Sequence, residues 1–248
     1  MFQVVTSLTA EHDWRLVVLE GLVCFLANVG AISLFYRAQA ATGRERMVWL
    51  SLDAAAAGYG IWATHFIAML AYDHTFGAGY DLTLTILSLL LAVLMTGAGF
   101  MIAMRNSGLW TAVLGGAVVG LGIAAMHFTG MRALELPGRV TWLPNLVVAS
   151  VALGIVLGSL ALSVAARRND WASTLLAAVL LTLAVVMTHF TAMGAMRFVP
   201  DPTLILDKAP LSTGSLSFLA AGAAGLSLGM SLVATLSDRQ SKAELRQQ

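Results

Sequence analysis

Three histidines recur at one interval along this chain of 248 residues. His65, His127 and His189 follow a 62-residue period, and each is followed directly by phenylalanine. Each also has a methionine four residues later, and these are Met69, Met131 and Met193. All three pairs lie inside long apolar stretches, where an ionisable side chain is costly and is a functional candidate by default. The repetition indicates one site built from three parts, or one site built three times.

The residue types favour a site for a soft metal ion. Positions i and i+4 lie on one face of a helix, so each histidine and its methionine can point to the same place. Imidazole binds copper, zinc, iron and nickel, and a thioether selects Cu(I). No carboxylate recurs with the histidines, so a site for Ca²⁺ or Mg²⁺, which take oxygen ligands, is not expected. The pattern therefore predicts a copper site, and leaves open whether there is one site or three.

The competing interpretation is ordinary packing. A single histidine in a membrane helix commonly hydrogen-bonds a carbonyl of a neighbouring helix, and methionine is an ordinary filler of apolar cores. Small residues three positions after the histidines, at Ala68, Gly130 and Ala192, let helices approach closely in either case. Because the three pairs fall in register, a metal site is favoured over three separate packing contacts.

The elements that must position these residues are membrane-spanning helices. Hydrophobic residues make up 58% of the chain and charged residues 11%, whereas soluble domains carry about 25% charged residues. The net charge of +1 offers no basic surface for nucleic acid, and the single cysteine excludes an internal disulfide or a cysteine-based zinc cluster. Seven stretches reach the roughly 20 apolar residues that a spanning helix needs. They cover residues 14–37, 47–72, 82–104, 110–132, 145–166, 173–196 and 214–236.

We therefore expect an all-α integral membrane protein with seven transmembrane helices, arranged as three two-helix repeats that follow the histidine period, plus a seventh helix. Residues 1–13 would form an extracytoplasmic N-terminus, 14–236 the membrane domain and 237–248 a short cytoplasmic tail. This orientation follows because nine Lys and Arg lie on one side and five on the other, and basic loops stay in the cytoplasm. The histidines then lie roughly 7–12 Å below the outer surface, at 1.5 Å per residue.

The arginines that close two helices follow the same repeat. Arg105 and Arg167 are separated by one 62-residue period, but Arg37 precedes Arg105 by six residues more than one period. The six additional residues predict a longer first cytoplasmic loop.

The three motifs resemble those of the MHYT family of bacterial membrane sensors. In that family, seven predicted spans carry a Met-His-Tyr-Thr motif three times, near the outer side. The copy Met126-His127-Phe128-Thr129 is the most similar one, while Thr64 and Thr188 replace the leading methionine in the other two. Phenylalanine replaces the family tyrosine in all three copies, so a hydrogen bond or redox role of a tyrosine phenol is not expected here, whereas ligation by histidine and methionine is unaffected.

The resemblance implies a sensor that binds copper and through it detects O₂, CO, NO or copper itself. It also implies a place in the bacterial cytoplasmic (inner) membrane and a cytoplasmic signalling partner, either a cyclic-di-GMP enzyme or a kinase. The last segment, residues 237–248, is too short for such an output domain. We therefore expect a stand-alone form that is not itself an enzyme and signals to a separate chain.

Two acidic residues fall inside the apolar segments. Glu20 lies about 9 Å into the first helix, at the depth of the histidines. It would fix a histidine tautomer or accept a proton; the alternative is that its carboxyl pairs with Arg15 or extends outward to the membrane surface. Asp53, near the opposite end of the second helix, is expected to pair with Arg46 or Arg105.

Five other residues are expected to assist the metal site. The residues directly before the histidines, Thr64, Met126 and Thr188, would support the ligands. His12 and His74 fall outside the membrane, where they could capture an incoming cation.

The seventh segment carries Gly222, Gly225 and Gly229, a spacing typical of close helix packing. This face would mediate a homodimer or pack inside the bundle. Two other functions stay open: a metal or proton transporter or channel, and a haem-binding redox membrane protein, since paired histidines on facing helices can hold haem. No Ser-His-Asp set or carboxylate pair suggests hydrolysis.

Overall fold

The computed structural model describes residues 13–72, 79–105, 108–201 and 211–245, with side chains described as far as Val233. Seven helices in these residues are long and apolar enough to cross a membrane. They confirm the predicted segments to within a few residues, except that the last helix continues further. The helices are α2 (Trp14–Ala40), α3 (Gly43–Ala71), α4 (Leu82–Ala103), α5 (Leu109–Ala133), α6 (Pro144–Ala165), α7 (Trp171–Met193) and α8 (Thr213–Leu245).

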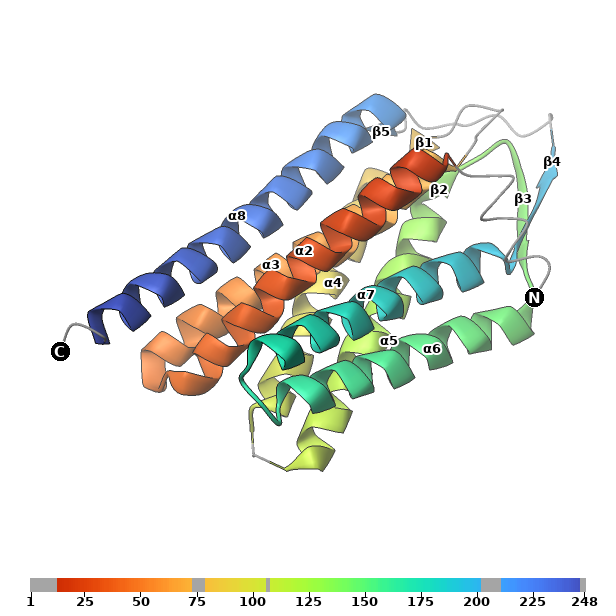
Figure 1. Cartoon of the computed structure of the whole chain (residues 1–248). Helices are drawn as coiled ribbons and strands as arrows, with labels where there is room; N and C mark the ends of the chain where they lie inside the picture. Colours follow the sequence, from red (N-terminus) through yellow and green to blue (C-terminus); the bar gives the residue numbers. More distant parts are fainter. Residues whose placement is uncertain (1–12, 73–78, 106–107, 202–210, 246–248) are drawn as a thin grey trace.

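Six of these helices form a closed ring in chain order, and the ring closes where α7 packs against α2. Inner and outer helices alternate in it. Between 50% and 72% of the span residues of α3, α5 and α7 are buried, against 28–39% in the other four helices. Helix α8 lies outside the ring, against α2 and α3 (Figure 1). The three predicted two-helix repeats are therefore arranged about a central axis lined by α3, α5 and α7.

A main-chain hydrogen bond closes each repeat at the same end. The bonds run from Asp13 N to Ala71 O, from Asp81 N to Ala133 O and from Leu143 N to Ala195 O, with lengths of 2.9, 2.7 and 2.9 Å. The acceptors follow the 62-residue period throughout, but the first donor precedes the second by six residues more than one period. The six additional residues therefore belong to the first repeat.

The predicted longer first loop is wrong. Helix α2 ends at Ala40 and α3 begins at Gly43, so this connection is the shortest of the three at that end. The additional residues lengthen the helices instead, because α2 has 27 residues and α4 and α6 have 22 each. An apolar segment that continues as helix keeps its main-chain groups hydrogen-bonded, which a loop beside lipid would not.

Glycines allow neighbouring helices to touch through their backbones. A Cβ added to Gly120 would overlap the main chain of Gly154, and one added to Gly116 would overlap that of Gly158. Small residues at such crossings are typical of membrane helix pairs. They bring the inner helix α5 and the outer helix α6 into direct backbone contact.

Short strands follow the inner helices, in connecting segments where the sequence predicts no strand. Strands β2 (Leu134–Glu135), β1 (Gly79–Tyr80) and β5 (Leu211–Ser212) form one antiparallel sheet in that order. Strands β3 (Gly138–Trp142) and β4 (Met196–Pro200) form another, with Val140 opposite Phe198. All lie at one end of the bundle, which we call the strand end (Figure 1). Loops that meet there satisfy each other's main-chain groups by pairing.

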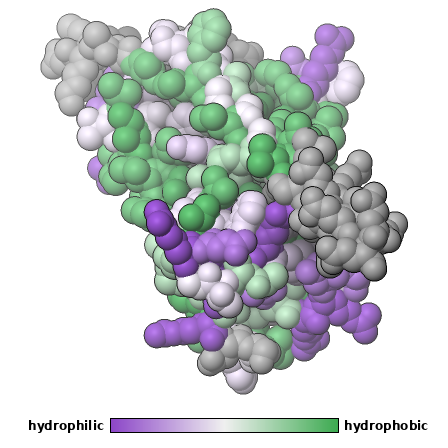
Figure 2. All heavy atoms as spheres, turned by 90° about the vertical axis from the view of Figure 1, so that its left-hand side faces the viewer, coloured by the Kyte–Doolittle hydropathy of each residue, from purple (hydrophilic) through white to green (hydrophobic). Residues whose placement is uncertain are grey.

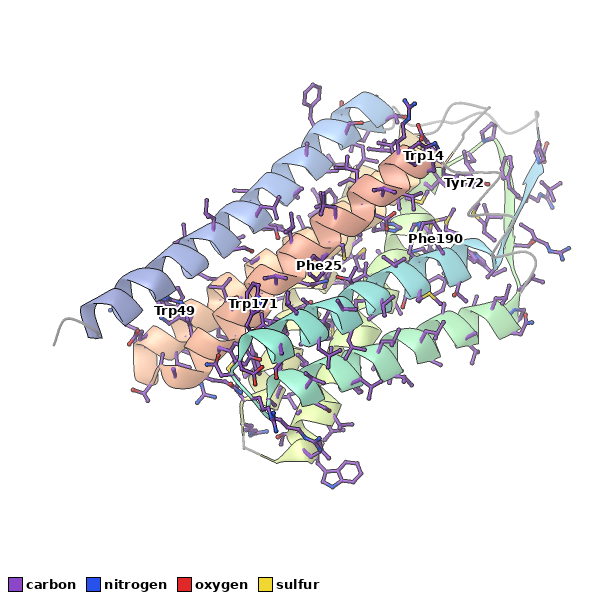
Figure 3. All side chains as sticks on the ribbon, in the orientation of Figure 1. Trp14, Phe25, Trp49, Tyr72, Trp171 and Phe190 are labelled. Carbon is purple, nitrogen blue, oxygen red and sulfur yellow. The ribbon has the colours of Figure 1, made fainter. Side chains whose placement is uncertain are left out.

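The surface is that of a multi-pass membrane protein. On the face in Figure 2, apolar side chains cover the upper part and hydrophilic ones gather below. Aromatic residues occupy both ends of the bundle, with Trp14 and Tyr72 near the strand end and Trp49 and Trp171 near the other (Figure 3). Trp14 and Trp171 are exposed. Such aromatic belts mark the two interfaces of a bilayer.

The glycines of α8 face away from the bundle. A Cβ added to Gly222, Gly225 or Gly229 would meet nothing within 4 Å. The alternative that this face packs inside the bundle is therefore wrong, and a homodimer remains a prediction.

Candidate metal centre

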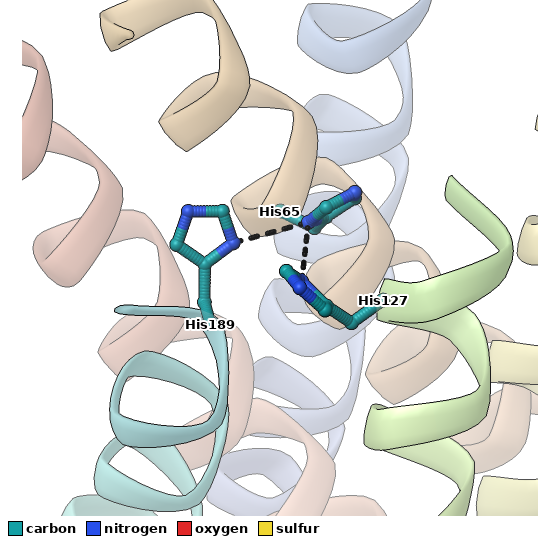
Figure 4. Close-up of side chains that lie close together, drawn as sticks. All are labelled: His65, His127 and His189. Atoms are coloured by element: carbon teal, nitrogen blue, oxygen red, sulfur yellow. Dashed lines mark hydrogen bonds between the residues drawn. The ribbon is translucent and has the colours of Figure 1, made fainter. Parts of the chain in front are cut away.

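The ring architecture places one histidine from each repeat on the central axis. His65 lies on α3, His127 on α5 and His189 on α7, and all three side chains are buried. These are the three inner helices, and they cross the bundle in the same direction. Equivalent positions on parallel helices lie at equal depth, so the three imidazoles meet (Figure 4).

The imidazoles converge through their Nδ1 atoms. His65 Nδ1 lies 3.1 Å from His189 Nδ1 and 3.2 Å from His127 Nδ1. The ring centroids are 4.8, 5.2 and 5.1 Å apart for the three pairs, and one nitrogen of each ring lies within 4.8 Å of the others. The three copies of the motif therefore build one cluster, which we call the histidine triad.

Hydrogen bonds within the triad cannot satisfy it. A neutral imidazole has one N–H donor and one acceptor nitrogen. The single proton or lone pair on His65 Nδ1 can serve one neighbour well, yet two neighbouring nitrogens lie within 3.2 Å. Three buried imidazole nitrogens within 4.8 Å of one another are instead an arrangement that suits a bound cation.

The packing interpretation predicted hydrogen bonds from the histidines to helix carbonyls. In the described part of the chain, Nε2 of His65 and of His127 has no hydrogen-bond partner. For these two residues the sole polar neighbours that the structure gives are other imidazoles of the triad. The geometry therefore favours a shared site over separate packing contacts.

The nitrogen spacing suits a single metal ion. Imidazole nitrogens bind such ions at roughly 2.0–2.1 Å, so a tetrahedral arrangement separates two of them by about 3.3 Å. The two observed separations, 3.1 and 3.2 Å, differ little from this value. Small rotations of the rings would make the three nitrogens ligands of one ion.

The three methionines are buried beside the triad on the same helices. Met69, Met131 and Met193 belong to the apolar core, one helical turn nearer the strand end than the histidines. The contacts that define the triad are made by imidazoles, so the thioethers remain predicted ligands.

The residues directly before the histidines are buried as well. The Thr64 hydroxyl donates to Gly60 O at 2.7 Å, and the Thr188 hydroxyl donates to Ser150 O at 3.3 Å. Met126 belongs to the apolar core. The Thr64 bond lies within α3, whereas the Thr188 bond joins α7 to α6.

Glu20 lies at the depth of the triad, as predicted. It is fully buried, and neither carboxyl oxygen has a hydrogen-bond partner among the residues that the structure describes. Arg15 is exposed instead and packs over the Trp14 ring at 5.7 Å, so the predicted alternative of a pairing with Arg15 is wrong.

Three other predictions concern polar residues away from the triad. Asp53 is buried without a hydrogen-bond partner among the described residues, while Arg46 donates to Met104 O at 2.8 Å and Arg105 is exposed. The predicted pairing of Asp53 with an arginine is therefore wrong. His12 and His74 lie outside the described residues.

Aromatic rings enclose the triad. Phe66, Phe128 and Phe190 pack edge-on against the histidine that precedes each of them, with centroids 4.8, 5.1 and 5.0 Å apart. Tyr80 of β1 packs on Phe66 at 5.8 Å, and Trp142 of β3 packs on Phe128 at 5.5 Å. Burial raises the pKa of Tyr80. The strands thus hold aromatic side chains over the site and make its surroundings apolar.

Among the described glycines, Gly130 on α5 is the one whose added Cβ would meet a histidine of the triad. A Cβ there would stand 2.6 Å from His65 Nε2. The sequence singled out this position as small, but its contact with an imidazole depends on how α3 and α5 cross, which a single helix pattern does not give.

The family model named MHYT, described as a bacterial signalling protein N-terminal repeat, matches residues 58–116 and 120–178. Both matches begin seven residues before a triad histidine, so they reproduce the 62-residue period. No solved structure matches the chain.

Three relatives are bacterial signalling proteins. An uncharacterized signaling protein of Caulobacter vibrioides is 37% identical over 88% of this chain and 27% of its own length. The bifunctional diguanylate cyclase/cyclic di-GMP phosphodiesterase MucR of Pseudomonas aeruginosa is 34% identical over 77% of this chain and 29% of its own. The cyclic di-GMP phosphodiesterase NbdA of the same organism is 37% identical over 73% and 24%. The chain thus spans less than a third of these relatives.

Proposed function

The chain belongs to the MHYT family of bacterial signalling proteins, a sensory membrane domain and not an enzyme, and on this premise we propose that its histidine triad is a copper-binding sensor site. The observation that supports the proposal is the convergence of three Nδ1 atoms, two pairs of them 3.1 and 3.2 Å apart, inside an apolar core. The site lies on the axis of the repeats, where one ion contacts all three.

The ligands would be Nδ1 of His65, His127 and His189, with the thioethers of Met69, Met131 and Met193 one turn away. Neutral imidazoles and thioethers are soft or borderline donors that suit Cu(I). Binding through Nδ1 requires each proton to sit on Nε2, and the crossing of the inner helices holds the rings in that orientation. When bound, copper supplies a centre that can take O₂, CO or NO.

The surrounding residues keep water from the site. Phe66 and Phe128, covered by Tyr80 and Trp142, enclose the triad on the side of the strand end. A diatomic gas can enter such an apolar enclosure more readily than a hydrated ion. The sensed signal is therefore one of these gases or the supply of copper itself.

The output would be a cytoplasmic signalling protein. Two relatives are named as cyclic di-GMP enzymes, so a cyclic-di-GMP enzyme is the first candidate and a kinase the second. We place the chain in the bacterial inner membrane with the strand end and the N-terminus outside, as the distribution of basic residues predicts. The exposed glycine face of α8 would form a homodimer contact.

The triad geometry disfavours haem held between two of these histidines. An iron with two axial nitrogens at roughly 2 Å each separates them by about 4 Å, with a porphyrin plane between. His65 Nδ1 and His189 Nδ1 are 3.1 Å apart, which leaves no room for that plane.

Metal analysis of the purified chain tests the proposal. We expect about one copper per chain in the unaltered protein, and none in a His65/His127/His189→Ala variant. A Met69/Met131/Met193→Leu variant keeps the shape of the core and is expected to keep the stoichiometry with weaker binding, since leucine cannot coordinate. Equal copper content in the unaltered protein and the histidine variant would overturn the proposal. A Soret band in the visible spectrum would indicate haem instead.

A further inference from the structure

Glu20 is a buried acid for which the described residues offer no hydrogen-bond partner. Its relative exposure is 0%, and both carboxyl oxygens lack a hydrogen-bond partner among the described residues. An ionised carboxylate without a partner is strongly destabilising in a protein interior and within a membrane span. While nothing balances its charge, Glu20 is therefore neutral and carries a proton.

The pairing of α2 with α3 puts Glu20 level with the triad. Asp13 N donates to Ala71 O, which fixes the register of these two antiparallel helices. Glu20 lies seven residues after Asp13, and Thr64 lies seven residues before Ala71. Glu20 is thus opposite Thr64, the residue before His65, and the Cys24 thiol is a neighbour of both Glu20 and Thr64.

The other two repeats show that the fold does not need an acid here. Through the repeat register, Glu20 corresponds to Ser88 in the second repeat and Ser150 in the third, and both serines are fully buried. Ser88 accepts from Trp62 Nε1 at 3.0 Å, and Ser150 donates to Val147 O at 2.8 Å. Two equivalent positions are thus filled by small, hydrogen-bonded neutral residues. The acid at this position in the first repeat therefore has a role other than helix packing.

The triad itself contains no negative charge. Three neutral imidazoles around a monovalent cation leave a buried net charge of +1 in an apolar core. Among the described residues, the titratable side chains at this depth are the three histidines, Cys24 and Glu20. Asp53, the other buried acid, lies 12 residues before His65 on α3, or about 18 Å along the helix. Glu20 is therefore the carboxyl placed to balance a cation in the triad.

We propose that Glu20 is the counter-charge of the triad, and that each cation bound there displaces one proton from Glu20 to bulk water. This inference rests on the proposed function. The exchange balances: one monovalent cation enters, the carboxyl O–H bond breaks, one proton leaves, and the buried charge stays at zero. A divalent ion would leave a net charge of +1, so the site favours soft monovalent cations such as Cu(I) and Ag(I).

Proton counting during Ag(I) titration tests the proposal, because Ag(I) mimics Cu(I) without changing oxidation state. All variants carry Cys24→Ser, so that no thiol binds silver or releases a proton. The solution is weakly buffered at about pH 7, which is still above the ordinary histidine pKa of ~6.5. We expect about one proton released per Ag(I) in this background. Glu20→Gln should release almost none and bind roughly 10–100-fold more weakly.

Asp53→Asn is the matched control, because it neutralises the other buried acid far from the triad. It should keep both the proton release and the affinity. The inference is overturned if Glu20→Gln still releases one proton with unchanged affinity, or if Asp53→Asn has the same effect as Glu20→Gln. Either result would leave the triad as a metal site. A chain that binds no Ag(I) or Cu(I) would overturn the proposed function as well.

Discussion

Replacing Gly130 by alanine should displace one imidazole of the triad and weaken cation binding. A Cβ at this position would lie 2.6 Å from His65 Nε2 and 3.0 Å from its Cδ2, whereas ordinary contact begins at 3.4 Å. The ring must therefore withdraw by 0.8 Å, the difference between 3.4 and 2.6 Å. Metal–ligand distances tolerate only about ±0.2 Å, so the shift is too large for an unchanged site.

The magnitude follows from the packing around His65. Its Nδ1 is already 3.1 and 3.2 Å from the two other triad nitrogens, so the ring has little room to move within the site. Overpacking of this kind costs about 1–3 kcal/mol. If that cost falls on the bound state, affinity drops by about 5- to 150-fold, at 1.4 kcal/mol for each factor of ten.

Calorimetric titration with Ag(I) measures the effect, and thermal unfolding without metal checks that the variant is folded. Gly222→Ala is the matched control, because its Cβ would meet nothing within 4 Å on α8. It should bind with unchanged affinity. The repeat equivalents of Gly130 are Ala68 and Ala192, so a methyl group is compatible with the helix itself. A folded Gly130→Ala variant with unaltered affinity would refute the role of His65 as a ligand in the observed geometry.

Three further predictions concern single residues. His65→Ala should lose more Ag(I) affinity than His127→Ala or His189→Ala, because both Nδ1–Nδ1 contacts include His65; equal losses would contradict this ranking. Tyr80→Phe should leave thermal stability unchanged or raise it by up to about 1 kcal/mol, because the buried Tyr80 hydroxyl has no hydrogen-bond partner among the described residues; a clear loss would reveal a partner. The Asp170 side chain accepts from Ser173 N at 2.8 Å at the start of α7, and hydrogen bonds from Ser173 lower the Asp170 pKa. Because the folded pKa lies below the unfolded one, this cap is complete above the unfolded value of ~3.9 and is lost as pH falls through the folded pKa. Asp170→Asn should remove that acid-dependent step from hydrogen exchange at the start of α7, and an unchanged pH profile would contradict the assignment.

The central site could be predicted from the sequence because it depends on periodicity. A 62-residue step contains two membrane helices and their loops, so equivalent residues fall on parallel helices at one depth. His65, His127 and His189 could therefore be placed in one layer. Which ring nitrogens meet could not be predicted, because that depends on how α3, α5 and α7 cross. The contact of Gly130 with His65 was missed for the same reason.

Two wrong pairings and the missed strands depend on how the helices and loops of different repeats meet. Asp53 is predicted to pair with Arg46 or Arg105, and Glu20, as one alternative, with Arg15. Both acids are instead buried in the bundle, and the three arginines lie elsewhere. A hydropathy pattern shows how deep a residue lies, not which side of its helix faces the core. The strands were missed because they are two to five residues long and form only where loops of different repeats meet.

The site is built from three equivalent repeats, but helix α8 packs mainly against the first of them. Three equivalent repeats suffice to bring three imidazoles to one point, but a symmetric ring has no preferred direction for a signal. Helix α8 breaks the symmetry by packing against α2 and α3, where Ser227 Oγ donates to Ala56 O at 2.7 Å. The first repeat also carries Glu20 and His65, whose Nδ1 lies within 3.2 Å of the Nδ1 atoms of both other histidines. A change at the triad would therefore reach α8 most directly through the first repeat, which holds His65, the buried acid and the contact to the last helix.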